Sequence, residues 1–387
     1  MATLPTGDPR PRKDVMLALR LAFVADSPLE VPVLQRVLEL AESRGHEALL
    51  LLGDECATVD AALYCTDRPP RKLMRPAFVS LNGLDQGHAR WPQPWKTMDW
   101  SRYDIGFLPG DAWKRRWQRS AYLRRSYPRL GVAMPGWPRS DVFAGHRGVV
   151  DRIQEEQTDP PRTVLYAPSF ECDGKQQELA AALAGTNHRL LIKHWNIPAL
   201  RSQYPDLFEW IETANSAVAG QPNVEIIPPE TDLYTILPEV DLLVTDQSST
   251  IYDALAAGVP SLAVAGWPIR TSRSKVARPL NPSPDVTFVG RSDSLQRDVE
   301  RALGADGRRA AIKARSQVFA NFGFAGNAML DIIESVVETW PSARRDMFVA
   351  GPSPWMRLSA PMRRAAFESQ RFSQRLRRHT GERAAFS

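Results

Sequence analysis

Residues 241–260 read DLLVTDQSSTIYDALAAGVP. An apolar run ends in the acid Asp246, two serines follow, and residues 250–257 have helical composition up to Gly258. A strand that passes into a helix through a short polar turn is the repeating unit of a parallel sheet covered by helices. The segment therefore predicts a doubly wound α/β domain, with its polar turn at the edge of the sheet where ligands bind.

The same alternation of strand and helix runs through both halves of the chain. In the first half we expect a helix at 31–44 and strands at 17–25, 48–52, 78–81 and 105–108. In the second half we expect helices at 176–184, 233–237 and 250–257, and strands at 163–166, 189–193, 224–227, 241–245 and 261–265. Neither half carries GxGxxG, which disfavours a dinucleotide oxidoreductase.

A polar, proline-containing stretch at about residues 149–162 separates the two halves and reads as a linker. We therefore predict α/β architecture of the GT-B type, two Rossmann-like domains facing a cleft. The expected N-terminal, acceptor-side domain spans residues 15–150 and the expected C-terminal, donor-nucleotide-binding domain spans 151–340. A basic, amphipathic C-terminal tail follows at 341–387.

Composition limits the classes of protein that this chain can belong to. Of its 387 residues, 43% are hydrophobic and 24% are charged, which is the composition of a folded chain. Its three cysteines form no CxxC pair, so we expect neither a disulfide framework nor a thiolate zinc site, and no metal or cofactor beyond a donor substrate. No apolar run suits a signal peptide or a membrane span, so the expected location is the cytoplasm.

Positive charge gathers in two places. Residues 341–387 hold ten arginines against three acids, a local charge of +7, together with Trp355 and Phe372. Residues 113–125 combine basic side chains with Trp113 and Trp117, four apart on one helical face. Either cluster could lie on an anionic membrane, which predicts a peripheral enzyme on the inner membrane face, or could be a solvated helix that packs its apolar stripe on the protein. Nucleic acid is disfavoured because no nucleic-acid motif accompanies the charge.

The polar turn of residues 246–253 is the first candidate site. Ser248 and Ser249 stand where they can cap the following helix, and the free N–H groups of a first helical turn bind phosphate or diphosphate. Asp246 and Asp253 are placed to contact a ribose or an attacking hydroxyl. The alternative is an ordinary helix cap without a ligand.

Three further candidates stand at the ends of other expected elements. Ser169 follows the strand at 163–166 in a Pro-Ser turn that can bind phosphate oxygens. His194 follows the strand at 189–193, where an imidazole can contact a diphosphate or protonate a leaving group, although a lone histidine is more often structural. Arg139, in PGWPRSD, can hold a carboxylate or phosphate with two hydrogen bonds, or can pair with Asp141 to fix the turn.

Together these segments resemble the CDP-glycerol glycerophosphotransferases that build teichoic-acid-like and capsular polymers. The similar segments, in order, are GWPRSD at 136–141 (G-x-PRND in the family), YAPSF at 166–170 (YAPT and then F or W), IKHW at 192–195 (a strand ending in His-Pro) and DLLVTDQSSTIYD at 241–253 (D-x-LITDYSS-x-x and then F or Y, D). FGFAGNAMLDII at 322–333 is a weaker match to a closing helix. The resemblance covers about residues 75 to 335.

This resemblance implies a GT-B enzyme whose second domain binds CDP-glycerol and whose first domain binds a lipid-linked or glycan acceptor. Ser169, His194, Ser248 and Ser249 would hold the diphosphate, with Arg139 at the domain junction. The family uses a histidine of its first domain as general base. Here the corresponding segment is SLNGLDQGH at 80–88, with Asn82 at the expected histidine position, so Asp85 or His88 would take over as base.

Three functions remain open at the level of sequence. The first is transfer of glycerol phosphate from CDP-glycerol. The second is a GT-B glycosyltransferase that uses a nucleotide sugar at the same diphosphate site, since Trp195 and Gln247 depart from the family's residues in the donor pocket. The third is a non-catalytic relative that binds lipid or polymer.

Overall fold

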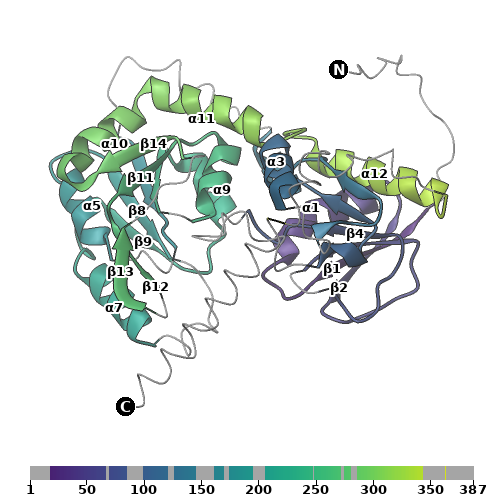
Figure 1. The fold of residues 1–387 in the computed structure, drawn as a ribbon. Helices are drawn as coiled ribbons and strands as arrows, with labels where there is room; N and C mark the ends of the chain where they lie inside the picture. Colours follow the sequence, from purple (N-terminus) through teal and green to yellow (C-terminus); the bar gives the residue numbers. More distant parts are fainter. Residues whose placement is uncertain are drawn as a thin grey trace, which may run out of the picture.

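The computed structural model describes residues 18–66, 69–84, 99–120, 126–144, 161–169, 174–194, 205–246, 248–271, 274–279, 286–342 and Met362. These residues form two six-stranded parallel sheets, each flanked by helices, and the sheets lie in separate lobes (Figure 1). A small antiparallel hairpin, β12 (Pro268–Thr271) and β13 (Ser274–Pro279), adjoins the second sheet. The α/β class predicted from the sequence is confirmed.

The first sheet has the strand order β2-β1-β3-β4-β5-β6. Its strands are β1 (Arg20–Ala25), β2 (Glu47–Leu52), β3 (Ala61–Cys65), β4 (Ala77–Ser80), β5 (Ile105–Phe107) and β6 (Gly131–Ala133). Helix α1 (Val31–Ser43) joins β1 to β2, which pair in parallel, so the predicted strand-helix-strand unit is confirmed. The chain then returns past β1 to build the other side of the sheet, which makes this sheet doubly wound.

The second sheet has the order β14-β11-β10-β7-β8-β9. Its strands are β7 (Thr163–Tyr166), β8 (Arg189–Lys193), β9 (Val224–Ile227), β10 (Leu242–Thr245), β11 (Ser261–Ala265) and β14 (Phe288–Arg291). Its helices include α5 (Gln176–Leu183), α7 (Pro205–Ser216), α8 (Leu233–Ile236), α9 (Thr250–Ala257) and α10 (Leu295–Leu303). Strand order reverses between β7 and β10, and ligands of such sheets bind outside the carboxyl ends of the strands at that reversal.

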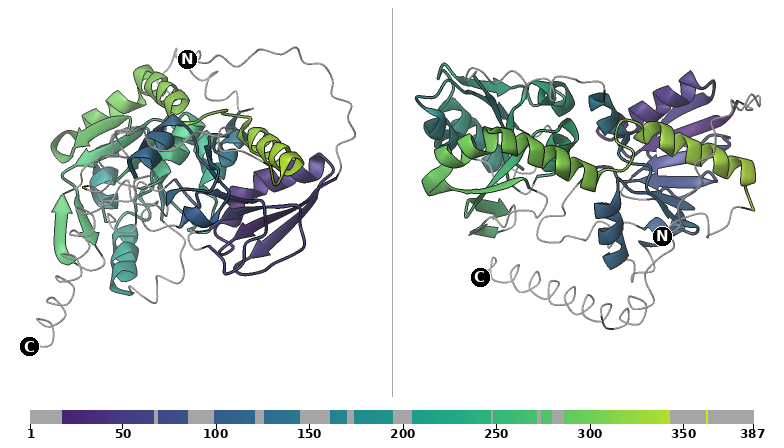
Figure 2. Two further views of the ribbon diagram at one scale, coloured as in Figure 1. Left: turned by 45° about the vertical axis from the view of Figure 1, so that its right-hand side comes forward. Right: turned by 90° about the horizontal axis from the view of Figure 1, so that it is seen from above.

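Two long helices carry the chain back from the second lobe to the first. Helix α11 (Ala305–Val318) lies along the second lobe and α12 (Ala325–Thr339) along the first, as the right-hand view of Figure 2 shows. The boundaries predicted at residues 150 and 340 fall within or next to residues that the structure does not describe, and they stay predictions. Within the range 151–340, however, α12 packs on the first lobe.

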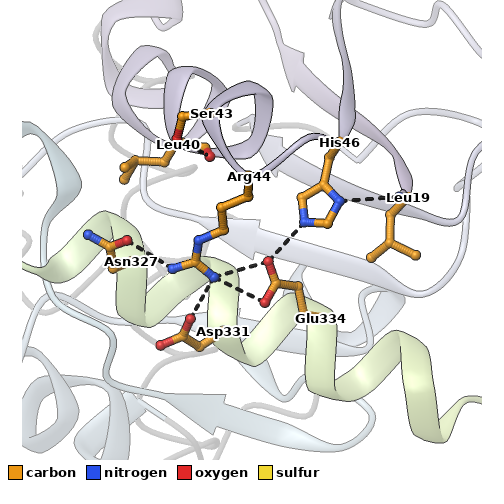
Figure 3. A network of polar contacts seen from close by, with 8 residues as sticks. All are labelled: Leu19, Leu40, Ser43, Arg44, His46, Asn327, Asp331 and Glu334. Carbon is orange, nitrogen blue, oxygen red and sulfur yellow. Dashed lines mark hydrogen bonds and ion pairs between the residues drawn. The ribbon is translucent and has the colours of Figure 1, made fainter. Parts of the chain in front are cut away.

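A polar cluster holds α12 against the end of α1 (Figure 3). The Arg44 guanidinium donates to Asp331 Oδ1 at 2.7 Å, to both Glu334 oxygens at 3.0 Å and to Asn327 Oδ1 at 2.8 Å. His46 Nε2 lies 2.9 Å from Glu334 Oε1. Arg44 and His46 lie between α1 and the start of β2, and the three acceptors lie on α12, so α12 is anchored to the first sheet by charge as well as by apolar packing.

The membrane role expected for two tryptophans of helix α3 (Asp111–Ser120) does not agree with their positions in the structure. Trp113 and Trp117 are almost completely buried. Trp113 packs edge-on against the Tyr252 ring of α9, with ring centroids 4.5 Å apart, and Arg116 donates to the Tyr252 hydroxyl at 2.9 Å. The apolar stripe of α3 therefore faces the protein, at a contact between the two lobes, and the idea that these tryptophans enter a membrane is wrong.

The other features behind the membrane prediction are not described. Trp355 and Phe372, and most of the expected linker at 149–162, lie outside the described residues. Among the residues that the structure describes, no helix is both long enough and apolar enough to cross a membrane.

Candidate functional site

Asp246 organises the carboxyl edge of the second sheet between β7 and β10. Its side chain is completely buried. Oδ1 accepts from the backbone N–H of Ser169 and from that of Ser248, both at 2.9 Å, and Oδ2 accepts from the Ser169 hydroxyl. The expected direct contact of Asp246 with a ribose or hydroxyl does not fit this burial, because both carboxylate oxygens are engaged in holding the turns that carry Ser169 and Ser248.

Two threonine side chains also link the turns that carry Ser169 and Ser248. Thr245 Oγ1 donates to the Ala167 carbonyl at 2.8 Å, and Thr250 Oγ1 donates to the same carbonyl at 3.1 Å. Since Ala167 follows β7 and Thr250 opens α9, the Pro-Ser turn and the serine turn form one hydrogen-bonded unit. The sequence had predicted both turns, and the structure brings them together at the point where strand order reverses.

Ser248 and Ser249 stand at the N-terminus of α9, as expected. Ser249 occupies the N-cap position, but its side chain makes no capping hydrogen bond. Ser248 Oγ instead accepts a long bond, 3.4 Å, from the Thr250 N–H. The expected cap is thus weak and comes from Ser248, while Ser249 stands at the positive end of the helix dipole.

His194 lies at the end of β8, the strand next to β7, and is buried. Its Nε2 is 2.8 Å from Asn215 Oδ1 on α7. The preceding Lys193 donates to the carbonyls of His194 and Pro229, at 3.3 and 3.0 Å. Burial lowers the pKa of Lys193, although the neighbouring acids Asp232 and Glu230 oppose this effect.

Arg139 reaches across from the first domain to the second. It lies in the short helix η4 (Pro138–Phe143), donates to both oxygens of Asp232 at 2.7 and 2.8 Å, and covers the Tyr234 ring at 3.9 Å. The alternative that Arg139 pairs with Asp141 is therefore wrong. The expected position of Arg139 at the junction between the domains agrees with these contacts.

Asp253, on α9, joins Arg139, Asp232 and Tyr234 in a cluster at the junction of the two domains, called the junction cluster below. The Tyr234 hydroxyl donates to Asp253 Oδ1 at 2.8 Å and accepts from Trp137 Nε1 at 3.2 Å. Burial raises the pKa of Asp253 to about 6, against the opposing effects of Arg139 and the tyrosine hydrogen bond. Burial, together with the Asp253 charge, also raises the pKa of Tyr234 well above 10. The cluster thus contains a carboxyl group that exchanges its proton just below neutral pH.

The rest of the PRSD turn is structural. Asp141 accepts hydrogen bonds from the N–H groups of Ala325 and Gly326, at 3.0 and 2.7 Å, and so caps the start of α12. Gly136 has φ +108°, and a Cβ there would lie 2.3 Å from the Ala320 carbonyl oxygen, so only glycine fits. One short turn therefore contacts helix α1 of the first lobe, the second domain and the returning helix.

The structure describes only part of the first-domain segment 80–88 that was expected to carry the general base. Asn82 follows β4 and is partly buried, next to the buried Leu81 and Leu84. Asp85 and His88, expected as alternative general bases, lie outside the described residues. Their roles stay predictions.

Sequence reasoning missed several residues of the site. Asp232 accepts from the Tyr234 N–H at 3.1 Å and caps α8, and an acid directly before the helix predicted at 233–237 was a usable signal. Tyr234 and Asn215 had no such signal, because they meet Asp253 and His194 only through the packing of α8 and α7.

Comparison with known proteins identifies the fold. No protein-family model matches the chain, and no curated protein matches it by sequence. The wall teichoic acid polymerase TagF matches with a TM-score of 0.54 and 14% identity, over 83% of this chain and 90% of that one. A variant of TagF soaked with CDPG gives 0.53 and 14%, over 82% and 88%. A putative UDP-N-acetylglucosamine 2-epimerase from Listeria monocytogenes gives 0.53 and 13%, over 85% and 98%. The two parallel sheets and these similarities together show that the chain has the GT-B fold.

Proposed function

We propose that this chain is a transferase that passes glycerol phosphate from CDP-glycerol to a hydroxyl group of a lipid-linked or polymeric cell-surface glycan and releases CMP. One observation carries the proposal. The hydroxyl-bearing turns of Ser169 and Ser248 share the buried Asp246 at the point where strand order reverses, and His194 ends the adjacent strand. This edge is where doubly wound sheets bind their ligands.

The chemistry required of the protein is mainly electrostatic. The acceptor oxygen forms a bond to the phosphorus that carries glycerol, the bond from that phosphorus to the bridging oxygen breaks, and CMP leaves with this oxygen. Negative charge spreads over the phosphoryl oxygens during transfer. The N-terminus of α9 and the hydroxyls of Ser248 and Ser249 are suited to stabilise it, whereas the Ser169 hydroxyl donates its proton to Asp246 and Arg139 is paired with Asp232.

Proton transfer completes the reaction. The acceptor hydroxyl loses its proton, for which Asp85 and His88 are the proposed bases of the first domain. His194 is proposed to contact the diphosphate of the donor. We assign Asp246 a positioning role, since it supports both turns without reaching a ligand itself, and we keep Asp253 as a junction carboxyl close to the donor.

Donor binding tests this proposal. The double change Ser248→Ala and Ser249→Ala should weaken CDP-glycerol binding roughly tenfold to a hundredfold, because a hydrogen bond to a charged group contributes about 1.5–3 kcal/mol. Isothermal titration calorimetry measures the affinity. The fold should persist, since the loss of a cap costs only about 1 kcal/mol.

The matched control is Ser43→Ala with Ser316→Ala. These two exposed serines donate to carbonyls of their own helices, at 2.8 Å each, so the control should bind the donor like the wild type. Equal affinity in the wild type and the Ser248, Ser249 variant would reject the phosphate role of α9. A transfer assay with CDP-glycerol and a panel of UDP and GDP sugars decides between glycerophosphotransfer and the glycosyltransferase alternative.

A further inference from the structure

The imidazole of His194 contacts the side-chain amide of Asn215, which belongs to a different element. The imidazole follows β8, whereas Asn215 is near the end of α7, and 21 residues separate them in sequence. Their contact, 2.8 Å between Nε2 and Oδ1, is short enough for a strong hydrogen bond. Helix α7 therefore determines how the ring is oriented at the edge of the sheet.

The partners of Asn215 define which of its atoms faces the ring. Its Oδ1 also accepts from Gln176 Nε2 at 2.9 Å, and Gln176 is completely buried at the start of α5. An amide oxygen only accepts hydrogen bonds. Both contacts are therefore satisfied when Nε2 of His194 carries a proton.

We propose that Asn215 is a positioning residue that holds His194 in the tautomer protonated on Nε2, so that Nδ1 is the basic nitrogen of the neutral ring. The role of this nitrogen rests on the proposed function: once it has taken up a proton, it can donate to the donor diphosphate or to the departing phosphate oxygen. The tautomer itself does not, since it is inferred from the contacts of Asn215 Oδ1 with Gln176 and His194. In a neutral histidine one ring nitrogen carries the proton and the other carries the lone pair. The hydrogen bonds that the ring makes decide which nitrogen is which.

Nitrogen-15 NMR of the histidine-labelled, full-length protein tests this inference without any donor. At pH 8, we expect the His194 signals, assigned with His194→Gln, to show a single tautomer protonated on Nε2. Asn215→Leu removes the acceptor and should shift these signals to a mixture of both tautomers. Asn215→Asp keeps an acceptor oxygen in the same place and should retain the single tautomer.

Internal references separate this effect from general loosening. His46 and His188 each accept a backbone N–H on Nδ1, from Leu19 at 3.2 Å and from Arg162 at 3.3 Å, so their tautomers should stay the same in every variant. Asn223→Ala, at an asparagine that donates to the His188 carbonyl, is the matched control and should leave the His194 signals in place. An unchanged His194 tautomer in Asn215→Leu would overturn the inference.

Activity then links the tautomer to the reaction. With CDP-glycerol and acceptor, Asn215→Leu should lower turnover at least tenfold, approaching the roughly 10²–10⁴-fold that removal of a general acid or base costs, and Asn215→Asp should restore most of it. A single tautomer in a wild type that transfers nothing from any donor would reject the proposed function and leave the positioning role intact. Full turnover in Asn215→Leu, despite mixed tautomers, would reject the link between Asn215 and the chemistry.

Discussion

At the scale of single residues, Asp253 makes a distinct prediction about stability and pH. Its folded pKa, raised by burial to about 6, lies above the value of 3.8 for an unperturbed aspartate. The folded protein therefore binds this proton more tightly than the unfolded chain does. This residue's contribution to the free energy of unfolding is largest below pH 4, falls between about pH 4 and 6, and is constant above that.

Asp253→Asn removes this pH dependence while keeping an oxygen for the Tyr234 hydroxyl. We expect the variant to be more stable than the wild type at pH 8 by on the order of 1–3 kcal/mol, and the advantage to shrink toward pH 4. Urea unfolding at several pH values measures it, with Asp206→Asn as the control for loss of an exposed carboxyl group. A variant that is less stable at pH 8 would mean that Arg139 outweighs the burial of the carboxylate.

At the scale of elements, Asp141 controls the start of α12. Asp141→Ala leaves the N–H groups of Ala325 and Gly326 without their acceptor, which should cost about 1–2 kcal/mol and speed hydrogen exchange in the first turn of α12. Burial raises the pKa of Asp141, so a neutral side chain is tolerated there and Asp141→Asn should lose much less.

Hydrogen exchange followed by mass spectrometry locates the effect. The second half of α12 serves as the internal comparison, since Arg44 and His46 hold Glu334 independently of the cap. Protection lost evenly along α12, or unchanged protection of its first turn, would show that Asp141 does not act as the cap of this helix.

At the scale of the whole molecule, the buried Trp113 and Trp117 leave the arginine-rich tail as the remaining basis for membrane binding. We propose that this tail holds the protein on an anionic membrane surface, where a lipid-linked acceptor is presented. Each basic residue near such a surface contributes about 1 kcal/mol and is screened by salt. Full-length protein should therefore sediment with anionic vesicles at low salt and dissociate as salt rises.

Truncation after Ser342 keeps both sheets and α12, and it should abolish sedimentation without affecting donor binding. The matched control is Lys114→Gln with Arg115→Gln, which removes two charges from the outer side of α3 and should reduce binding only slightly. Equal binding of full-length protein to neutral and anionic vesicles would contradict the electrostatic account.

Local patterns determined much of this fold. The expected strands at 163–166, 189–193 and 224–227 coincide with β7, β8 and β9, because each is a short apolar run bounded by polar turns. The turns that follow β7 and β10 were also recognisable, since hydroxyl residues directly after a strand mark the ligand edge of a parallel sheet. In contrast, β3 (AALYC), β6 (GVA) and β14 (FVGR) were not predicted, and length does not explain the omission of β3, which has 5 residues against 4 in the predicted β7.

The sequence by itself therefore determined the α/β class, the place of the turns that carry Ser169 and Ser248, and the position of His194 at a strand end. Only the tertiary structure decided that Asp246 is a buried support, that Arg139 pairs with Asp232, and that the tryptophans of α3 pack against α9. The physical reason is the distance in sequence between the residues that interact. Strands, helices and turns follow from neighbours within a few residues, whereas the environment of a polar or aromatic side chain depends on which distant elements the packing of the core brings beside it.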